Sequence, residues 1–467
     1  MNIFVLNCGR LALKFQLIKV EQEKVLARGL IEKIGTDNAL LSYTPHNQNT
    51  FHKVMEIKDY DMAVKLILNA LTDPMVGVLQ DIGEIAAVGH RVVHGGERFS
   101  DSVLLTPIVV DGIKACMEFA PLHNPLNLQG IEACSKWIPD IDQVAVFDTA
   151  FHTHLPEYAF IYGLPYDVYE QLKIRRYGFH GISHRYASQQ AAAILNRNYA
   201  DFKAIICHLG SGSSIAAVKD GISVDTTMGF TPLEGLIMGT RCGNIDPAII
   251  PYLMEKEHLA CQEIEDLMNT ASGLKGISKM THDMLEIEEE AEAGSELPQL
   301  ALEMFCYRVK KYIGEYFAVL GDVDAVVFTA GIGENSATVR RKVCEGLACF
   351  GITLDEQKNQ RSETVISTGP TPVLIIPRHE ELAIAKETYR IVYEKRQKRR
   401  AEQEGLKIQE ALSTLTDADK AKITLLWSHH QDLAYAQLYE LVQREMRLTI
   451  DLNAFEALLT KMGFTKP

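Results

Sequence analysis

The pattern of apolar and polar positions repeats itself once along the chain. Near the N-terminus it predicts three short strands separated by turns, one of which contains Gly9, at residues 3–7, 13–18 and 25–31. Farther along, the same plan returns around a Gly-Ser-Gly turn, with strands at residues 204–209, 214–218 and 222–226. Alternating helices and buried strands follow each unit. We therefore predict an α/β protein built from two duplicated halves.

Four further apolar runs predict buried strands that end in polar residues. They are residues 85–88 before Gly89-His90-Arg91, 144–147 before Asp148, 325–328 before Gly331–Asn335, and 373–376 before Glu380. In α/β sheets, ligands collect at the carboxyl ends of the strands. These polar residues are therefore candidates for a functional site.

Composition narrows the classes of protein. With 467 residues, 47% of them hydrophobic and 23% charged, the chain can form two or three globular domains. A net charge of -14 argues against a general nucleic-acid binder. Nine scattered cysteines without a C-x-x-C pair indicate reduced thiols rather than disulfides or a zinc ribbon. Because we find no signal peptide and no membrane-length apolar run, we expect a cytoplasmic protein.

One segment indicates phosphate chemistry. The basic pair Arg175-Arg176 is closely followed by His180, and after one predicted helix comes the glycine-rich turn at 210–212. Cations and backbone N–H groups of this kind can surround phosphate oxygens. The segment is typical of a phosphotransferase.

Several separate motifs carry a more specific resemblance. They are GHRVVHGG (89–96), FDTAFH (147–152), YGFHG (177–181), MGTR (238–241) and GIGEN (331–335). With them, the chain resembles the acetate and propionate kinases of the actin-like sugar kinase superfamily over roughly residues 1–395. The resemblance implies reversible transfer of the γ-phosphoryl group of MgATP to a short-chain carboxylate. Acetate or acetyl phosphate and ATP or ADP are then the expected partners, with no nucleic acid and no membrane.

The resemblance also implies an architecture. We expect a two-lobed duplicated actin-like, or ribonuclease H-like, α/β fold with an appended helical C-terminal module. The expected parts are an N-terminal lobe at 1–150 completed by a helix at 383–400, a C-terminal lobe at 151–382, and an appendage at 401–467. Relatives of this kind are homodimers, so we expect a homodimer.

Family resemblance assigns the catalytic roles. Arg91 and Arg241 match the arginines that offset the repulsion between two anions, and His180 would donate a hydrogen bond to the transferring group. Asp148 matches the catalytic aspartate, with a role more positional than proton-transferring, since acetate is already ionised. The Mg²⁺ positions, with Mn²⁺ as an alternative ion, match Asn7 and Glu380. Taken singly, each residue could be structural; their combination favours catalysis.

The substrate and nucleotide residues follow from the same resemblance. Those matching the acceptor site are Arg91, Val93, Leu122, His123, Phe179 and Pro232. Val93 is bulky enough to favour acetate, and one added methylene changes discrimination by about 1–3 kcal/mol, so propionate should be a poorer substrate. Those matching the nucleotide site are Lys14, His208, Leu209, Gly210, Ser211, Gly212, Asp283, Met284, Leu285, Gly331, Ile332, Gly333, Glu334 and Asn335.

Departures from the family pattern fall mostly on the donor side. The first phosphate loop, usually serine-rich, has Arg10, Leu11 and Ala12, and a cation usual in the adenosine region is replaced by Leu285. Ser211 and Asn244 also differ from the usual residues, as do Arg378 and His379. Arg10 could pair with a phosphate or block its site.

These departures leave two alternatives to an ATP-dependent acetate kinase. One is a catalytically impaired regulatory paralogue that binds acetyl phosphate or nucleotide. The other is a carboxylate kinase that uses another donor, such as pyrophosphate. The sequence also leaves open the physiological direction of the reaction and the choice of acid.

Beyond residue 395 the resemblance ends. The basic run 395–400 continues a helix and is typical of a solvated face rather than a nucleic-acid site. A new helix is predicted to begin at Thr416, and a last one carries Phe455, Leu458 and Leu459. Between them lie apolar residues at helical spacing: Ile423, Leu426, Trp427, Tyr435, Leu438, Leu441 and Val442. We expect this stripe to dock on the kinase body or on a second subunit.

Overall fold

The structure, a computed structural model, describes residues 1–9, 12–446 and 451–464. Arg10 and Leu11, which sequence analysis singled out, therefore lie outside the described residues. The chain forms two compact units, Met1–Tyr389 and Arg390–Pro467. No helix in the described ranges is long and apolar enough to cross a lipid bilayer.

The first unit contains an eight-stranded sheet in the order β5-β4-β3-β2-β1-β6-β8-β7. Its strands are β1 (Asn2–Cys8), β2 (Ala12–Lys19), β3 (Lys24–Glu32), β4 (Thr36–Pro45), β5 (Phe51–Ile57), β6 (Ile85–Val92), β7 (Val103–Leu104) and β8 (Gln143–Phe147). Strand β1 pairs antiparallel with β2 and parallel with β6, and β6 pairs parallel with β8. The carboxyl ends of β1, β6 and β8 therefore meet at one edge of the sheet.

A second sheet of the same unit repeats this plan in the order β11-β10-β9-β12-β13. Its strands are β9 (Lys203–Leu209), β10 (Ser213–Lys219), β11 (Ile222–Thr226), β12 (Ala325–Thr329) and β13 (Val373–Ile375). Strand β9 pairs antiparallel with β10 and parallel with β12, as β1 does with β2 and β6. The predicted internal duplication is thus confirmed.

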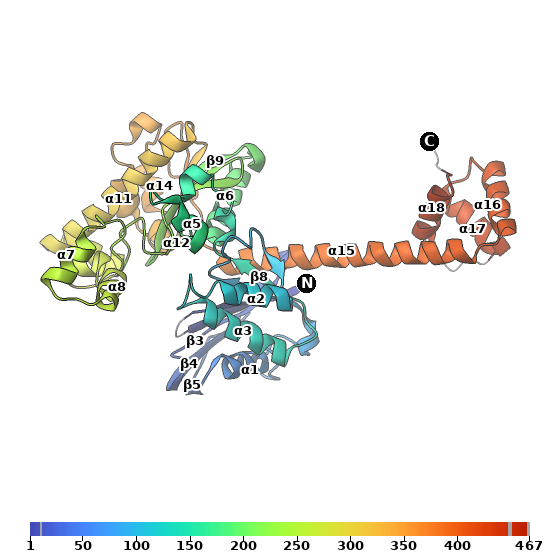
Figure 1. Cartoon of the computed structure of the whole chain (residues 1–467), viewed down its shortest axis with the longest axis horizontal. Helices are drawn as coiled ribbons and strands as arrows, with labels where there is room; N and C mark the ends of the chain where they lie inside the picture. The colour runs from blue at the N-terminus through green and yellow to red at the C-terminus, as the bar shows by residue number, and fades with distance from the viewer. Residues whose placement is uncertain (10–11, 447–450, 465–467) are drawn as a thin grey trace. The chain divides into compact units, whose positions relative to one another are not determined.

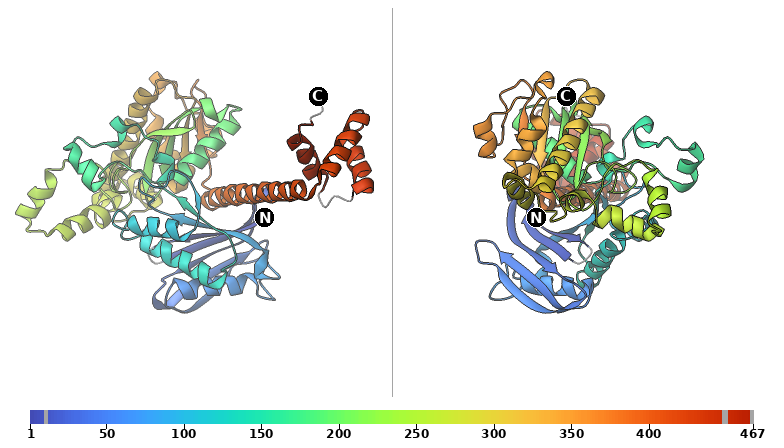
Figure 2. Two further views of the ribbon diagram at one scale, coloured as in Figure 1. Left: turned by 45° about the vertical axis from the view of Figure 1, so that its right-hand side comes forward. Right: turned by 90° about the vertical axis from the view of Figure 1, so that its left-hand side faces the viewer.

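Helices cover both faces of the first sheet. On one face lie α1 (Tyr60–Leu71) and α3 (Asn124–Trp137), which share a core with the strands (Figures 1 and 2). Val64, Ile67 and Leu71 of α1 recur at helical spacing and are buried in that core. The first turns of α15 pack on the other face, where Gly89 lacks the side chain that would collide with Thr388. α2 (Pro107–Ala115) packs with α3.

The second sheet lies between α6 (Gly181–Ile194) and α11 (Glu296–Leu320), each of which shares a core with its strands. The shorter helices are α4 (Glu157–Phe160), α5 (Tyr166–Leu172), α7 (Ile249–Lys256), α8 (Cys261–Thr270), α9 (Gly273–Ser278), α10 (Met284–Glu292), α12 (Ala330–Asn335), α13 (Ala337–Cys344) and α14 (Glu356–Gln360). Single 3₁₀ turns are η1 (Val20–Gln22), η2 (Ile82–Glu84), η3 (Ala150–His152), η4 (Tyr199–Asp201) and η5 (Ala348–Phe350).

Strand β6 is longer than the apolar run that predicted it. It continues through His90 and Arg91 to Val92, whereas the sequence suggested an end at Val88. The polar residues belong to the strand because His90 is buried and its Nε2 is hydrogen-bonded to Gln143 Oε1 of β8 at 2.7 Å. Arg91 is therefore held by the sheet ladder rather than by a loop.

In the C-terminal part, the described residues form the helices α15 (Glu380–Thr414), whose first residues belong to the first unit, α16 (Asp417–His429), α17 (Tyr435–Met446) and α18 (Leu452–Lys461). Thr416 caps α16 in a reciprocal pair with Asp419, as the predicted helix start requires. The apolar stripe is buried within the unit itself, in a core that includes Ile423, Trp427, Leu438, Val442, Phe455, Leu458 and Leu459. The expectation that this stripe docks elsewhere is wrong, because these side chains pack against one another.

Candidate active site

Arg91 and Asp148 form an ion pair at the carboxyl edge of the first sheet. Val92 and Phe147, which are adjacent to them, are partners in the β6–β8 ladder, so the two side chains come from neighbouring strand ends. Arg91 Nη2 donates to Asp148 Oδ2, and its Nη1 donates to Asn7 Oδ1 at 3.3 Å. Burial by itself would lower the pKa of Arg91, but the negative charges of Asp148 and Glu380 outweigh this effect and raise the pKa. The arginine stays charged at the centre of an acidic cluster.

Oxygen ligands suited to a hard cation lie around this pair. Glu380 begins α15, and its carboxylate has no hydrogen bond or ion pair among the described residues. Burial raises the pKa of Glu380, while Arg91 and Arg378 oppose that rise. The neighbouring Glu381 is instead paired with Lys14 at 2.7 Å. Asn7, Asp148 and Glu380 thus offer amide and carboxylate oxygens of the kind that Mg²⁺ prefers, and a cation would offset the cost of the Glu380 charge.

His180 and Arg241 meet at the glycine-rich turn after β9. His180 precedes α6 in a left-handed conformation with φ of 57°. A Cβ added to Gly212 would lie 3.5 Å from His180 Nε2 and 3.7 Å from Arg241 Nη1. The Arg241 turn is tied to the same loop, because the Gly239 N–H donates to the carbonyl oxygen of Ser211 at 2.9 Å. One imidazole and one guanidinium therefore face the loop together.

Burial keeps His180 neutral. Burial is the main cause that holds the pKa of His180 well below its usual value, and His208, His184, Arg91 and Arg241 lower it further. The His208 ring stacks on the His180 ring with centroids 4.1 Å apart and planes at 21°. Burial also lowers the pKa of His208 to about 3. At neutral pH the His180 ring can donate one hydrogen bond toward the site but carries no charge.

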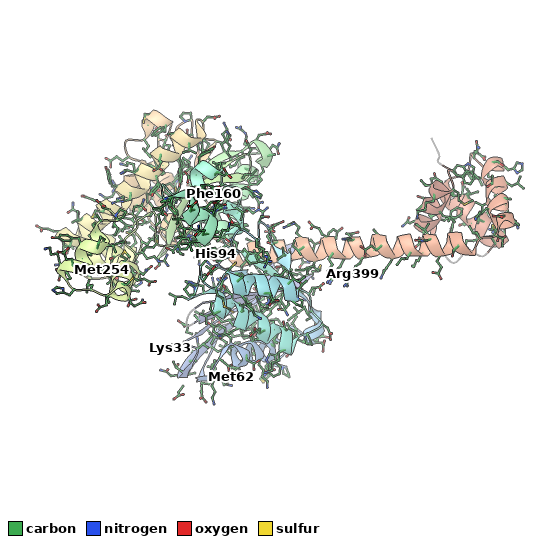
Figure 3. All side chains as sticks on the ribbon, viewed as in Figure 1. Lys33, Met62, His94, Phe160, Met254 and Arg399 are labelled. Carbon is green, nitrogen blue, oxygen red and sulfur yellow. The ribbon has the colours of Figure 1, made fainter. Side chains whose placement is uncertain are left out.

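A small apolar cluster lies beside these polar groups. It contains Val93, Ala120, Phe179, Met228 and Met238, all buried. Val93 and Phe179 were predicted from the sequence, whereas the other three were not. Next to this cluster lies His94, which is labelled in Figure 3. Its ring packs edge to face on Tyr177, with ring centroids 4.5 Å apart.

The other predicted acceptor residues lie differently. Leu122 is 56% exposed, and His123 lies at the cap of α3. Pro232 is half-buried, and its carbonyl oxygen accepts a hydrogen bond from Arg241 Nη1 at 3.2 Å. Pro232 therefore orients the arginine through its backbone.

A cavity of about 490 Å³ opens beside the loop after β9. Among the residues predicted to bind nucleotide, those lining it are Gly210, Ser211, Asp283, Met284, Leu285, Gly331, Ile332 and Asn335. Sequence analysis missed three polar lining residues, His282, Glu288 and Ser336, although Asp283–Leu285 pointed to the same segment. Ser336 Oγ donates to Glu288 Oε1 across the wall. The cavity combines glycine-rich backbone with a polar and an apolar wall.

The remaining predicted nucleotide residues do not line this cavity. Leu209 is buried in the core of the second sheet, and Gly333 packs on the end of β12. Glu334 Oε1 accepts the Arg378 N–H at 2.8 Å, and Lys14 is engaged by Glu381. As described above, His208 supports the His180 ring, and Gly212 faces His180 and Arg241.

Helix α12, which carries Gly331–Asn335, is fixed by a buried arginine that sequence analysis missed. Arg340 Nη1 donates to the carbonyl oxygens of Gly333 and Glu334, both at 2.9 Å. Its Nε donates to Asn359 Oδ1 at 2.8 Å. The last carbonyl groups of a helix have no partner within it, so Arg340 satisfies these groups and holds α12 at the cavity wall.

The basic pair Arg175-Arg176 has a structural role. Arg175 Nη1 donates to Glu97 Oε1 at 3.0 Å, and Arg176 Nη2 donates to Glu234 Oε1 at 2.7 Å. Arg176 also donates to the carbonyl oxygen of Thr226 at 2.9 Å. The expectation that this pair holds phosphate is therefore wrong, because carboxylates and carbonyl groups already occupy both guanidinium groups.

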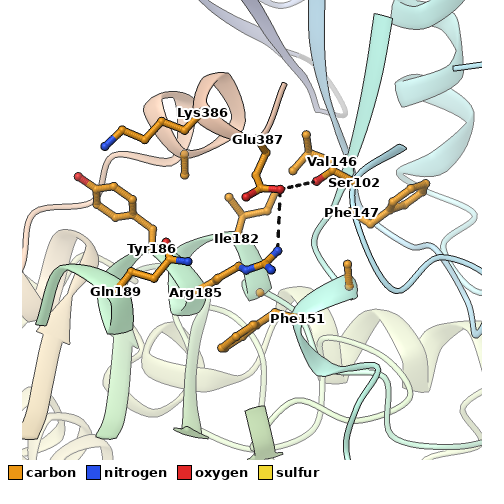
Figure 4. Close-up of a pocket in the computed structure, with 13 residues that line it drawn as sticks. Ser102, Val146, Phe147, Phe151, Ile182, Arg185, Tyr186, Gln189, Lys386 and Glu387 are labelled. Carbon is orange, nitrogen blue, oxygen red and sulfur yellow. Dashed lines mark hydrogen bonds and ion pairs between the residues drawn. The ribbon is translucent and has the colours of Figure 1, made fainter. Parts of the chain in front are cut away.

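A second, much smaller cavity of about 50 Å³ lies between β8, α6 and α15 (Figure 4). On its wall, Glu387 accepts a hydrogen bond from Ser102 Oγ at 3.2 Å and pairs with Arg185 Nη1 at 3.9 Å. The cavity holds little more than water, so it is no candidate for a substrate site.

Comparison with known proteins gives consistent matches. A model of the acetokinase family matches residues 2–386. The acetate kinase of Caldicellulosiruptor saccharolyticus is 52% identical over 398 residues, which cover 84% of this chain and 100% of that protein. The acetate kinase of Methanosarcina barkeri is 50% identical over 396 residues, covering 84% and 97%.

Solved structures match over the same part of the chain. The crystal structure of Porphyromonas gingivalis acetate kinase has a TM-score of 0.81 at 43% identity, covering 84% of this chain and 99% of that chain. A propionate kinase from Francisella tularensis has a TM-score of 0.79 at 42% identity, with the same coverage.

Proposed function

This chain belongs to the acetokinase family, and we propose that it catalyses reversible, Mg²⁺-dependent transfer of the γ-phosphoryl group of ATP to acetate, giving acetyl phosphate and ADP. The observation that carries the proposal is the convergence of Arg91, His180 and Arg241 between a small apolar cluster and the cavity beside Gly210–Gly212. An acceptor carboxylate and a phosphoryl donor can approach each other there.

The main physical obstacle to this reaction is charge. A carboxylate that attacks a phosphate brings two anions together, so the site must supply positive charge and hydrogen-bond donors. We assign Arg91 to the acceptor carboxylate, because it lies at the strand end beside Asp148 and two residues from Val93. Asp148 holds the Arg91 guanidinium in place rather than removing a proton.

We assign Arg241 and His180 to the transferring phosphoryl group. Both lie about one van der Waals contact from Gly212. A neutral His180 can donate one N–H to an equatorial oxygen, and Arg241 can donate in parallel. Arg241 is held in advance by the carbonyl oxygen of Pro232, and His180 is held by Ser214. Little reorganisation is therefore needed during transfer.

Asn7, Asp148 and Glu380 would hold the magnesium ion, directly or through water. When bound, it would supply positive charge to the phosphate oxygens of the donor. In the described ranges no cluster of three or more His, Cys, Asp or Glu side chains is arranged around a common point, which suits an ion that keeps much of its water. Mn²⁺ shares the preference for oxygen ligands.

Val93 and its neighbours would form the acyl pocket. Val93 and Phe179 are buried together with Met228 and Met238, so the side chains that would contact the methyl group of a short acid are apolar. Acetate is therefore the preferred acceptor and propionate a poorer one, with discrimination of about 1–3 kcal/mol per methylene.

The apolar lining of the donor cavity favours a nucleotide over pyrophosphate. Its lining includes Met284, Leu285 and Ile332, apolar side chains that pyrophosphate would not use. A nucleoside can cover them, which is how cofactor sites gain much of their affinity. Arg10 and Ala12 stand where the family usually has serine hydroxyl groups. The second candidate is therefore an enzyme that binds the donor phosphates weakly.

We also propose that the protein acts in the cytoplasm as a homodimer. Helix α7 has no buried residue in the single chain, and Ile249, Tyr252 and Met254 on it are partly exposed. An apolar helix of this kind is commonly covered in an oligomer. Light scattering coupled to gel filtration distinguishes a mass near twice 52.2 kDa from a monomer.

A hydroxamate assay with acetate, Mg²⁺ and a panel of donors tests the proposal. With acetate as acceptor, we expect acetyl phosphate to form fastest from ATP and hardly at all from pyrophosphate. With propionate as acceptor, we expect propionyl phosphate to form more slowly. A folded sample that turns over no donor above background would favour the regulatory paralogue instead.

A further inference from the structure

The hydroxyl group of Ser214 lies between two imidazole rings. His180 Nδ1 is 2.9 Å from Ser214 Oγ, and His184 Nε2 is 2.8 Å from the same oxygen. Ser214 and His184 are completely buried. A hydroxyl group has one proton, so it can donate to only one of two rings, and the other ring can bond to it only by donating an N–H.

The second nitrogen of His184 decides between the two arrangements. His184 Nδ1 is buried and has no hydrogen-bond partner among the described residues. A buried N–H without a partner is rarer in proteins than a buried acceptor without one. The proton of His184 therefore belongs on Nε2, which donates to Ser214 Oγ. The Ser214 proton then goes to His180 Nδ1.

This chain of donors fixes the remaining proton of His180 on Nε2. That nitrogen lies on the ring edge facing the glycine-rich loop, 3.5 Å from the Cβ position of Gly212, where Arg241 Nη1 also lies at 3.7 Å. Burial keeps the pKa values of both His180 and His184 well below the usual range. Neither ring therefore gains a second proton, which would reverse a hydrogen bond with Ser214.

We propose that Ser214 and His184 are positioning residues that hold His180 as the neutral Nε2–H tautomer, with this N–H directed at the transferring phosphoryl group. The inference rests on the proposed phosphotransferase function. With the opposite tautomer, His180 would present a lone pair to an anionic group, and the hydrogen bond would become a repulsion. The hydrogen-bond relay from His184 through Ser214 to His180 thus determines that the ring nitrogen of His180 facing the phosphoryl group is a donor.

The same fold provides a matched control. Ser223 Oγ is 2.7 Å from His152 Nδ1, so this pair is also a buried serine–histidine contact. The other nitrogen of His152 bonds to the Phe179 carbonyl oxygen at 3.0 Å and does not face Gly212. The His152 ring packs edge to face on the His184 ring with centroids 5.7 Å apart, but both of its nitrogens bond outside the relay. Ser223→Ala therefore removes a bond of the same kind without removing a hydrogen bond of the proposed relay.

Nitrogen-15 NMR of histidine-labelled full-length protein tests the tautomer directly. The His180 signals are identified by their loss in His180→Gln, and tautomers are distinguished by the shifts of the two ring nitrogens. We expect Nε2 to be protonated and Nδ1 bare in the wild type, a mixture in Ser214→Ala, and the wild-type pattern in Ser223→Ala. A wild-type His180 protonated on Nδ1, or an unchanged tautomer in Ser214→Ala, would overturn the inference.

Steady-state kinetics tests the consequence. Loss of one neutral hydrogen bond should lower kcat of Ser214→Ala about tenfold, with KM for acetate and donor changed by less than about threefold. Ser223→Ala should stay within about threefold of wild type. A similar loss in both variants, or an unchanged kcat in Ser214→Ala, would contradict the inference.

Two substitutions of His184 guard against a misfolded serine variant. His184→Gln can still donate an amide N–H to Ser214 and should keep most of the activity, whereas His184→Leu cannot donate and should behave like Ser214→Ala. Equal activity in these two variants would also contradict the relay. The NMR measurement needs no turnover, so a wild type that is inactive with every donor would refute the proposed function while the tautomer result still decides the relay.

Discussion

The N–H of Gly181 donates to the carbonyl oxygen of Asp148 at 2.9 Å, and a Cβ added to Gly181 would lie only 2.3 Å from that oxygen. The strand end that carries Asp148 is thus in direct backbone contact with the first residue of α6, next to His180. Because only glycine permits this approach, the contact fixes the position of the Arg91–Asp148 pair relative to His180.

Replacing this glycine should therefore damage the site more than the fold. We expect Gly181→Ala to lower kcat at least about tenfold, because the backbone of Asp148 or His180 must move by about 0.7 Å or more to lengthen this contact from 2.3 Å to 3.0 Å. Gly314→Ala in α11 is the control, since its Cβ would meet only Phe350 Cε2 at 3.8 Å and alanine favours helices. Equal rates in the two variants would mean that the contact has no role in registration.

Loss of either site arginine should affect turnover strongly. Arg91→Ala and Arg241→Ala each remove a preorganised donor, which costs roughly 3–4 kcal/mol of transition-state stabilisation, or about a hundredfold to a thousandfold in kcat. Arg361→Ala, which removes an exposed pair with Glu363, should have no effect. A near-normal rate in a folded Arg91→Ala or Arg241→Ala protein would show that the site is misplaced.

The proposed acyl pocket predicts a change of acceptor preference. Val93→Ala removes two methyl groups from the buried cluster with Phe179 and Met238. The ratio of kcat/KM for propionate to that for acetate should rise about tenfold or more. The ATP KM should not change, because the donor cavity does not include this residue. An unchanged acid preference would place the acyl group elsewhere.

A buried carboxyl group away from the site predicts a pH-dependent stability. Burial raises the pKa of Asp225 to about 6, although Arg176 and the Thr226 N–H act in the opposite direction. The folded state therefore binds more protons than the unfolded state between about pH 4 and 6, and stability decreases as pH rises through this window.

Asp225→Asn should remove the decrease in stability that occurs as pH rises. We expect a Tm higher than that of wild type by about 2–4 °C at pH 8 and no gain at pH 4. Asp111→Asn, on a side chain 75% exposed, should change Tm equally at both pH values. A Tm gain that is independent of pH would contradict the assignment to Asp225.

Much of the fold could be predicted from local pattern. Strands β1–β3 and β9–β11 alternate or are continuously apolar between glycine turns, so their burial is visible in the sequence. Strand β5 was not predicted, because most of Phe51–Ile57 is exposed and lacks a buried face. The end of β6 was misplaced because Gln143, distant in sequence, makes a buried His90 tolerable.

The site could be predicted only where strand ends or motifs mark it. Arg91 and Asp148 follow from neighbouring strands, and the structure does bring them together. Ala120, Met228 and Glu288 lie outside the matched motifs, and only tertiary packing places them at the site. The tautomer of His180 likewise depends on Ser214 and His184, whose roles no local pattern reveals.

The last prediction concerns the altered phosphate loop, where Ala12 begins β2 and Arg10 lies outside the described residues. Arg10→Ser combined with Ala12→Ser restores two hydroxyl groups at the donor side. We expect the ATP KM to fall and the acetate KM to stay nearly constant, because Val93 and Phe179 are unchanged. If Arg10 is instead a phosphate ligand, the double variant loses a charge-assisted contact worth about 1.5–3 kcal/mol, and use of ATP or pyrophosphate becomes worse. Steady-state kinetics of both proteins with both donors separates these outcomes, and no effect on either donor would mean that this loop does not contact phosphate.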